Sequence, residues 1–313
     1  DGSWGRVLIG GAPLMEASFS DDFQKVLSWS DEYARLEVWA NGDTAEDAKR
    51  ARSFGARGIG LCRTEHMFMA ADRLPVMQRL VVADSAEERA KALEELKVMQ
   101  KQDFYGILKE MHGLPVIIRL LDPPLHEFMP KERDLEEELG ALEKAGRGSS
   151  PEAERVRRVM AKVEQLKEAN PMLGFRGCRL GIVYPEIPAM QASAIFEAVL
   201  DLVDEGVEIY PEIMVPLVGL ETEMSFFREQ IDGIAKDYME KSGKEFNYKV
   251  GTMIEIPRAA FVADDIAKRA EFFSFGTNDL TQTAFGFSRD DAEGKFLGHY
   301  EDKGILPVNP FHE

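Results

Sequence analysis

The sequence predicts an α/β fold, a TIM-type (β/α)8 barrel that is incomplete at its C-terminus and carries a helical insertion. Short apolar runs with strand character alternate with longer amphipathic stretches of helical spacing, which is the pattern of βαβ units in a parallel sheet. Charged and polar residues follow several of these runs, at the strand ends where a parallel α/β fold builds its sites. A chain of 313 residues, 44% of them hydrophobic, can bury the core of such a barrel.

The strands are predicted from apolar runs at residues 36–40, 58–62, 115–121, 208–216, 250–256 and 272–275. The β–α rhythm repeats about seven times along the chain, whereas a closed barrel of this class needs eight strands. The last strand is therefore expected to be missing, and the chain is interpreted as a truncated piece of a longer protein.

The helices are predicted before, between and after these runs, at residues 19–33, 84–110, 187–203, 221–241, 258–270 and 280–286, with a further helix after Thr44. Thr44 and Asp47 have the spacing of an N-terminal capping arrangement. The first helix is interpreted as a linker, so residues 1–33 form the tail and linker helix of an upstream domain. Residues 34–313 form the barrel, and within them residues 300–313 are predicted to be a loop.

A charged segment at residues 131–169 interrupts this rhythm. It is rich in Glu, Lys and Arg, and Gly146–Pro151 separates it into two helical halves. Such a charge run is typical of the solvated faces of helices inserted in a loop. Because the segment is too long for an ordinary connection, we expect it to cover or flank the site.

The composition excludes several classes of function. The net charge of -18 argues against a nucleic acid or an anionic membrane as a partner, although a local pair of arginines can still bind a small anion. No apolar run approaches the roughly 18 residues of a membrane span. The two cysteines, Cys62 and Cys178, do not make a disulfide framework. Strand alternation points Cys62 and Arg63 to opposite faces, so Cys62 is expected to pack under a helix.

Two carboxylates end neighbouring strands of one predicted βαβ unit. Glu255 closes the first strand of the unit, and Asp279 lies just past the second. The C-terminal ends of parallel strands meet on one face of the sheet, so these side chains can converge on one hard cation such as Mg²⁺. The alternative is that Glu255 caps a helix and Asp279 lies in a turn.

Arginines accompany the same strand ends. Arg63 follows the strand at 58–62, and Arg119 lies near the end of the strand at 115–121, where a buried charge needs a partner or a function. Asp122 can supply that partner, and a salt bridge with Glu65 or a neighbour is the alternative for Arg63. Among the glycines at 170–180, Arg176 and Arg179 can approach an anion, and salt bridges to the charged insertion are the alternative there.

Long motifs of the chain resemble a known family. They are GIGLCRTEHMF at 58–68, RLLDPPLHEF at 119–128, NPMLGFRGCRL at 170–180, PEIMVPLVG at 211–219, GTMIEIPRAA at 251–260, FFSFGTNDLTQ at 272–282 and FGFSRDD at 285–291. Together they resemble the phosphoenolpyruvate (PEP)-utilising enzymes, and over essentially the whole chain they are similar to the PEP- and pyruvate-binding barrel of the pyruvate, phosphate dikinases. PEP synthase and Enzyme I of the phosphotransferase system share part of these motifs and are the alternatives.

The resemblance implies roles for particular residues. It implies that Arg63 and Arg119 bind PEP, with Arg176 as a further site arginine, and that Glu255 and Asp279 are Mg²⁺ ligands. It also implies that the loop of Gly276, Thr277 and Asn278 contacts the substrate. No catalytic residue is assigned with certainty, because the family's general acid is a cysteine after the last strand, in a region absent from this chain.

The resemblance also implies partners. The family's phosphorylated histidine and its nucleotide-binding domain lie upstream and are absent here. The whole enzyme is expected to couple the reversible phosphoryl transfer of PEP to the interconversion of ATP and phosphate with AMP and diphosphate. A homodimer is expected for the full-length protein. The cytoplasm is the expected compartment, with a plastid or glycosome as the alternative because the N-terminus is not shown. By itself, the chain is expected to be inactive, and a binding or dimerisation module is the alternative to a catalytic barrel.

Overall fold

The computed structural model describes residues 20–312, so the predicted tail at 1–17 lies outside the described residues. The chain divides into two compact units, Asp1–Val38 and Trp39–Glu313. In the first unit, α1 (Asp21–Tyr33) agrees with the predicted helix, and the Ser20 hydroxyl caps it by accepting a hydrogen bond from the backbone N–H of Phe23 (3.2 Å).

The second unit is built on one parallel sheet. Its strands follow in chain order, each paired with the next: β1 (Ala40–Asn41), β2 (Ile59–Arg63), β3 (Pro115–Arg119), β4 (Tyr210–Val215), β5 (Lys249–Ile254) and β6 (Phe273–Phe275). Within the described residues, β1 and β6 have one neighbour each, so the sheet is an open part of a barrel. This arrangement confirms the predicted fold class.

Two details of the strand prediction were wrong. The described chain forms a 6-stranded sheet, one strand fewer than the predicted number of repeats. The predicted first strand at 36–40 is reduced to β1, because Leu36 and Val38 are exposed and belong to the first unit. An apolar run is therefore not sufficient for a strand when no neighbouring strand buries it.

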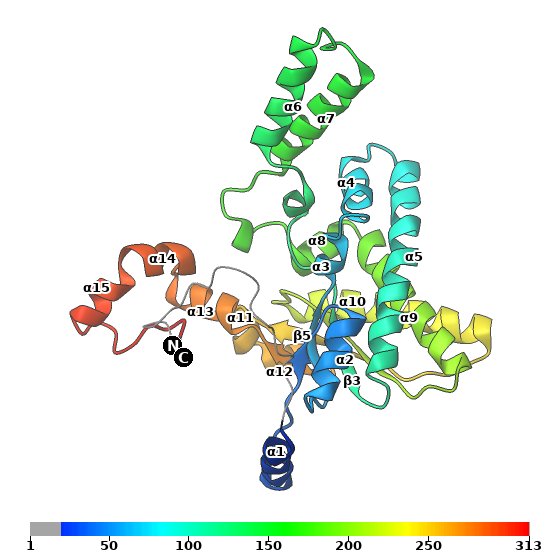
Figure 1. The fold of residues 1–313 in the computed structure, drawn as a ribbon, viewed down its shortest axis with the longest axis vertical. Helices are drawn as coiled ribbons and strands as arrows, with labels where there is room; N and C mark the ends of the chain where they lie inside the picture. The colour runs from blue at the N-terminus through cyan, green and yellow to red at the C-terminus, as the bar shows by residue number, and fades with distance from the viewer. Residues whose placement is uncertain (1–19, 313) are drawn as a thin grey trace. The chain divides into compact units, whose positions relative to one another are not determined.

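Helices cover the outer face of the sheet (Figure 1). The principal ones are α2 (Ala45–Ser53), α5 (Ala86–Glu110), α9 (Glu186–Asp204), α10 (Glu221–Ser242) and α12 (Ala263–Ile266), and each packs against the next in this order. Their apolar faces and the outward residues of the strands form the main core. Cys62 is buried in this core, which confirms its predicted orientation.

The predicted helix at 258–270 is divided in two. The structure has α11 (Pro257–Phe261) and α12, and between them Val262 leaves helical geometry, with φ -116° and ψ 24°. The other capped helices follow the prediction closely: Thr44 accepts a hydrogen bond from Asp47 N–H (3.1 Å) at the start of α2, and Gly243 ends α10 in the left-handed conformation with φ 68°.

Successive side chains along each strand point alternately to the inner and the outer face of the sheet. Ile117, Met214 and Met253 form a small inward cluster, separate from the main core. Side chains two residues further along a strand lie on the same face, so Arg119 follows Ile117 and Glu255 follows Met253 toward the C-terminal edge of the sheet. The alternation thus carries both charged side chains into the mouth of the partial barrel.

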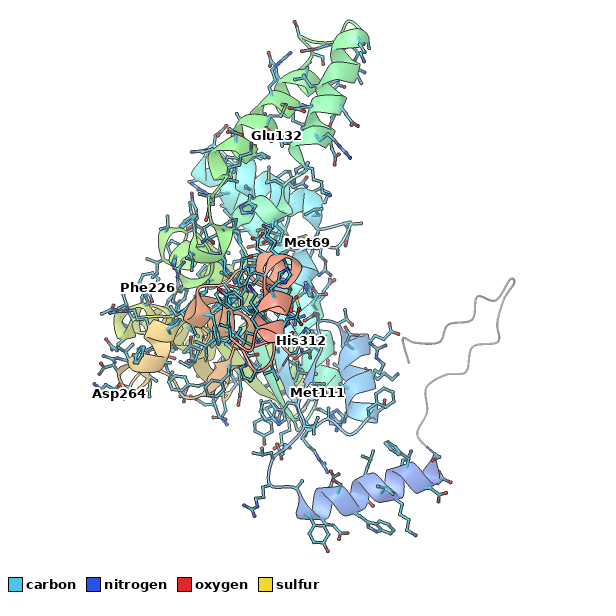
Figure 2. All side chains as sticks on the ribbon, turned by 90° about the vertical axis from the view of Figure 1, so that its left-hand side faces the viewer. Met69, Met111, Glu132, Phe226, Asp264 and His312 are labelled. Atoms are coloured by element: carbon cyan, nitrogen blue, oxygen red, sulfur yellow. The ribbon has the colours of Figure 1, made fainter. Side chains whose placement is uncertain are left out.

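The charged insertion forms a helical hairpin of α6 (Glu132–Lys144) and α7 (Pro151–Leu166), which confirms the two predicted helical halves. The helices pack against each other, and α7 also contacts α4 (Leu74–Val82) and the short helix η1 (Leu125–Phe128). The hairpin extends away from the sheet (Figure 1), and side chains project from all around it beyond Glu132 (Figure 2). It therefore does not cover the strand ends, one of the two arrangements expected for it.

The remaining helices are short: α3 (Thr64–Phe68), α8 (Gly177–Val183), α13 (Thr277–Phe285), α14 (Arg289–Lys295), α15 (Leu297–Asp302) and the turn η2 (Pro171–Leu173). The loop predicted at 300–313 is partly wrong, because α15 extends through Asp302 and stacks Phe296 and Tyr300 beside Phe287. Among the described residues, no helix is both long enough and apolar enough to span a membrane.

Candidate functional site

The C-terminal edge of the sheet gathers the predicted site residues. Arg63 ends β2, Arg119 ends β3, and the two are paired in register. Glu255 follows β5 directly, and residues 276–279 follow β6 as the loop and first turn of α13. The sequence therefore predicted correctly that these residues come from strand ends at one edge.

Five charged side chains form a row in which acid and base alternate: Glu65, Arg119, Asp122, Arg176 and Asp279. Arg119 Nη2 donates to Glu65, and its Nη1 lies 3.0 Å from Asp122 Oδ2. Arg176 Nη2 donates to the same Asp122 oxygen (2.7 Å) and to Asp279 Oδ2 (3.4 Å). We call this set the charged row. It confirms Asp122 as the partner of Arg119.

The charged row is buried but not fully satisfied. The side chain of Asp122 is 6% exposed and that of Arg176 12% exposed. Within the described residues, Glu65 Oε2, Asp122 Oδ1 and the Nε atoms of both arginines have no hydrogen-bond partner. Buried polar atoms of this kind are costly unless a ligand or water satisfies them, so the row has spare capacity for a polar ligand.

Glu255 lies beside this row. Its side chain is nearly fully buried, and its Oε1 accepts a hydrogen bond from the backbone N–H of Leu217 (2.7 Å). Burial, together with the negative charges of Asp122 and Asp279, raises the pKa of Glu255 to about 7. Because burial disfavours the charged form and Asp122 and Asp279 repel it, a cation bound beside Glu255 would stabilise its carboxylate.

Two carboxylates here fit a hard cation. Asp279 acts electrostatically on Glu255, and both offer the oxygen ligands that Mg²⁺ binds while it keeps water or substrate at its other positions. Gly276 leaves room for Glu255, because a Cβ there would lie 2.6 Å from Glu255 Cβ and 3.0 Å from its Oε2. The described residues contain no group of three or more His, Cys, Asp or Glu side chains that could hold a metal by themselves.

Arg63 is the uncompensated cation of the site. Its backbone N–H donates to Asp43 Oδ1 (2.7 Å), but its guanidinium makes no ion pair with any described residue. The predicted alternative was a salt bridge of Arg63 with Glu65 or a neighbour. Glu65 pairs with Arg119 instead, and the described residues show no ion pair of Arg63 with another neighbour. Arg63 can therefore offer a planar fork of donors to a phosphate or carboxylate.

The loop after β6 exposes its polar side chains. Thr277 and Asn278 are exposed in the first turn of α13, and Asn278 Oδ1 accepts from Arg289 Nη1 (3.3 Å). Arg179 lies outside the charged row and donates to the Gly174 carbonyl (2.9 Å). The alternative that Arg176 pairs with the insertion was wrong, because its partners are Asp122 and Asp279.

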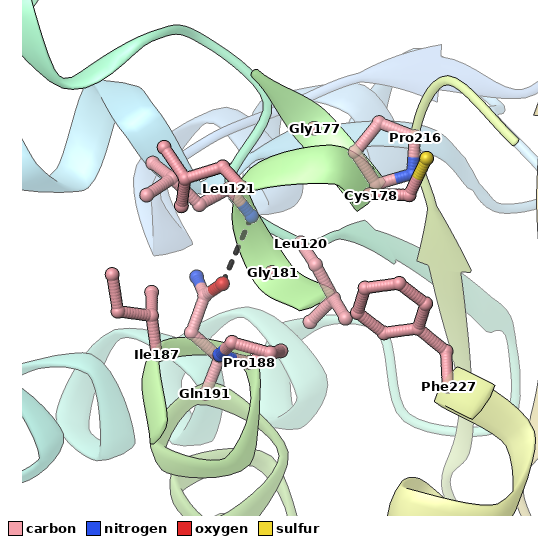
Figure 3. Close-up of a pocket in the computed structure, with 11 residues that line it drawn as sticks. Leu120, Leu121, Gly177, Cys178, Gly181, Ile187, Pro188, Gln191, Pro216 and Phe227 are labelled. Atoms are coloured by element: carbon pink, nitrogen blue, oxygen red, sulfur yellow. Dashed lines mark hydrogen bonds between the residues drawn. The ribbon is translucent and has the colours of Figure 1, made fainter. Parts of the chain in front are cut away.

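The end of β3 is anchored beneath the site. Gln191 on α9 is fully buried, and its Oε1 accepts a hydrogen bond from Leu121 N–H (2.9 Å), the residue before Asp122 (Figure 3). The small cavity around it is lined mainly by apolar groups, including Leu120 and Phe227, so it is a packing gap and not the candidate site.

Sequence reasoning missed three contributors to the site. Thr64 is buried and donates its hydroxyl to the Arg119 carbonyl (3.0 Å). Leu217 carries the N–H that binds Glu255, and nothing in its side chain signals this. Gly177 has φ 57°, a conformation that glycine adopts readily, and the glycine itself is the signal in the sequence for such a position.

Comparison with known proteins identifies the relatives of this chain. The family described as PEP-utilising enzyme, PEP-binding domain matches residues 18–309. The chain is 54% identical to pyruvate, phosphate dikinase 1, chloroplastic, of Oryza sativa subsp. japonica, over 99% of the chain and 32% of that protein. It is 51% identical to pyruvate, phosphate dikinase of Rhizobium meliloti and 49% identical to that of Giardia intestinalis, in each case over 99% of the chain and 34% of the relative. The chain thus spans about a third of the length of the curated relatives it matches.

Proposed function

Because this chain belongs to the PEP-utilising enzymes through their PEP-binding domain, we propose that it is the PEP- and pyruvate-binding part of a pyruvate, phosphate dikinase. In this function, the phosphoryl group of PEP moves reversibly to a histidine carried by another domain. We propose that domain, together with a nucleotide-binding domain that uses ATP and phosphate, as the partners of this chain. The relatives leave room for them, because the chain covers 32% of the length of the Oryza sativa protein.

The observation that carries the proposal is the meeting of two arginines and two carboxylates at one edge of the sheet. Arg63 and Arg119 are paired in register at the ends of β2 and β3, while Glu255 and Asp279 follow β5 and β6. A substrate with a phosphate and a carboxylate needs this combination: a cationic fork for one anionic group and a metal site for the other.

Each residue has a distinct task in binding. Arg63, free of ion pairs with described residues, binds phosphoryl oxygens, and Arg119 adds positive charge while it holds Glu65 and Asp122 in place. Glu255 and Asp279 would hold Mg²⁺, with Arg176 orienting Asp279. When bound, the cation supplies a positive charge that stabilises the carboxylate and the developing enolate oxygen of the substrate. Gly276, Thr277 and Asn278 line the same edge and contact the substrate.

The chemistry breaks the bond between phosphorus and the enol oxygen, and the resulting enolate of pyruvate takes a proton at its methylene carbon. The thiols of the described chain are unsuited to supply that proton. Burial raises the pKa of Cys178 to about 12 and that of Cys62 well above its usual range, and Cys62 packs in the core on the outer face of the sheet. The two described thiols are therefore poor candidates, and we propose that the proton comes instead from the cysteine that the family resemblance implies after the last strand of the barrel.

We propose a homodimer for the full-length protein and the cytoplasm or a plastid as its compartment. A plastid is included because relatives from Oryza sativa and Arabidopsis thaliana are named chloroplastic.

Isothermal calorimetry with oxalate, a mimic of the enolate, tests the proposed site. With the protein expressed from its complete open reading frame, we expect oxalate to bind only when Mg²⁺ is present. Glu255→Gln should lose this binding, whereas the surface substitution Glu245→Gln should keep it. Equal oxalate affinity with Mg²⁺ and with EDTA, or in Glu255→Gln and the unaltered protein, would refute the assignment.

A further inference from the structure

Leu217 has an unusual backbone for a buried aliphatic residue. It is the sole non-glycine residue with positive φ in the part of the chain that the structure describes, at 62°, and it is 2% exposed. The left-handed conformation is unfavourable for a residue with a Cβ, so the surroundings must impose it on Leu217. Leu217 lies two residues past the end of β4, at the same edge as the candidate site.

This conformation lets both polar groups of Leu217 reach neighbouring segments. Its N–H donates to Glu255 Oε1 (2.7 Å), and its carbonyl accepts a hydrogen bond from the Cys178 thiol (3.3 Å). Cys178 N–H in turn donates to the Pro216 carbonyl (3.1 Å), and Cys178 lies beside Pro216 at the start of α8 (Figure 3). The loop after β4 is thereby joined to Glu255 on one side and to α8 on the other.

The Leu217 side chain packs directly against the backbone of Gly177, where there is no Cβ. Gly177 itself has φ 57°, and a Cβ at this position would lie 2.9 Å from Leu217 Cδ1 and 3.0 Å from Leu217 Cβ. Gly177 follows Arg176 directly, and its N–H donates to the Asp122 carbonyl (2.8 Å). The contact between Leu217 and Gly177 therefore connects Glu255 with the charged row.

We propose that Leu217 is a positioning residue, and that its contact with Gly177 holds the Glu255 carboxylate and the Arg176 guanidinium in the arrangement that binds the divalent cation and substrate. The inference rests on the proposed function, because it assigns to the contact an effect on Mg²⁺-dependent binding at that site. Groups that orient the ligands of a metal typically change its affinity by about 10- to 100-fold when they are altered.

The first test compares two glycines. Gly177→Ala and Gly206→Ala each place a Cβ on a residue with positive φ, but Gly206, with φ 72°, has nothing within 4 Å of the added atom. In the full-length protein, we expect Gly206→Ala to bind oxalate and Mg²⁺ like the unaltered protein, and Gly177→Ala to bind them about tenfold more weakly.

The second test removes the contact from the other side. Leu217→Gly keeps the N–H and tolerates the left-handed conformation, but it loses the packing on Gly177. We expect it to weaken Mg²⁺-dependent oxalate binding by about tenfold too. The double variant Gly177→Ala with Leu217→Gly should bind oxalate no more weakly than either single variant, because the Cβ added at position 177 then meets open space. If the two substitutions acted independently, their losses of affinity would instead multiply to roughly 100-fold.

Calorimetry measures the oxalate affinity of each variant, and circular dichroism and thermal unfolding show whether the variant is folded and how stable it is. Together they distinguish an effect on binding from an effect on stability. Three results would each overturn the positioning role: equal oxalate affinity in Gly177→Ala and Gly206→Ala, unaltered oxalate affinity in Leu217→Gly, or multiplied losses of affinity in the double variant. The proposed function would still stand in these cases, as long as the unaltered protein binds oxalate in the presence of Mg²⁺. A lower unfolding temperature with unchanged Mg²⁺ dependence would assign the contact to stability alone and overturn the role as well. Absence of Mg²⁺-dependent oxalate binding in the unaltered protein would overturn both the role and the proposed function.

Discussion

Replacing Glu255 with glutamine should stabilise the metal-free protein at alkaline pH. The carboxyl group is 2% exposed, and its pKa is raised to about 7 by burial and by the charges of Asp122 and Asp279. The ordinary pKa of glutamate is about 4.3, so ionising Glu255 in the fold costs about 4 kcal/mol more than ionising it in the unfolded chain. Glutamine has nearly the same shape and can still accept the Leu217 hydrogen bond, but it carries no charge.

The sign of the pH dependence follows from the raised pKa. Neutral Glu255 is compatible with the folded site, and its contribution to stability is fully present below about pH 4.3 and is lost as the pH rises through 7. The advantage of Glu255→Gln should therefore be small near pH 4.5 and complete near pH 8. The glutamine amide N–H₂ gains no hydrogen-bond partner, which offsets part of this advantage. We therefore expect the free energy of unfolding to rise by about 2 kcal/mol at pH 8, which corresponds to roughly 5 °C in the unfolding temperature of a domain this size.

Differential scanning calorimetry of the full-length protein in EDTA, from pH 4.5 to pH 8, measures this difference. Glu245→Gln, at an exposed position before β5, controls for the change of surface charge. Saturating Mg²⁺ at pH 8 should reverse the order, because the cation stabilises the carboxylate that only the unaltered protein has. A Glu255→Gln variant that is no more stable than the parent in EDTA at pH 8, or equally more stable at both pH values, would refute the reasoning.

Three further predictions concern the same edge of the sheet. Arg119→Lys should keep the fold but lose most PEP turnover, because one ammonium cannot hold Glu65 and Asp122 at once; near-normal turnover would make Arg119 a structural partner only. Gly276→Ala should weaken Mg²⁺-dependent oxalate binding by at least about tenfold, since its Cβ would lie 2.6 Å from Glu255 Cβ, and calorimetry would expose unchanged binding. Cys62 and Cys178 are buried with raised pKa values, so a thiol-reactive dye at pH 8 should label them only after denaturation; rapid labelling of the folded protein contradicts this.

The sequence allowed the sheet and the position of the site residues to be predicted because both follow from alternation along short strands. Arg119 in an apolar run and Glu255 at the end of another have one consistent placement, inward and at the C-terminal edge. The burial of Cys62 on the opposite face follows from the same rule. These features depend on neighbours along the chain, and that is the information a single sequence contains.

Features that depend on partners distant in sequence were not predictable. Glu65 is two residues from Arg63, yet it pairs with Arg119, which lies at the end of the neighbouring strand β3. The left-handed Leu217 has no side-chain signature, since its conformation is imposed by contacts with Gly177 and Glu255. The run at 36–40 has the composition of a strand, but only its last residue pairs in the sheet, as the start of β1.

The alternation of charges along the row limits how this protein can change during evolution. Each interior member of the row, such as Asp122, pairs with two neighbours, so replacing it leaves two buried charges with one partner fewer each and lowers the stability of the fold. A neutral substitution at one position therefore becomes tolerable only together with a second one. We expect homologues to differ within this row in pairs or not at all, even where the surrounding surface has diverged freely.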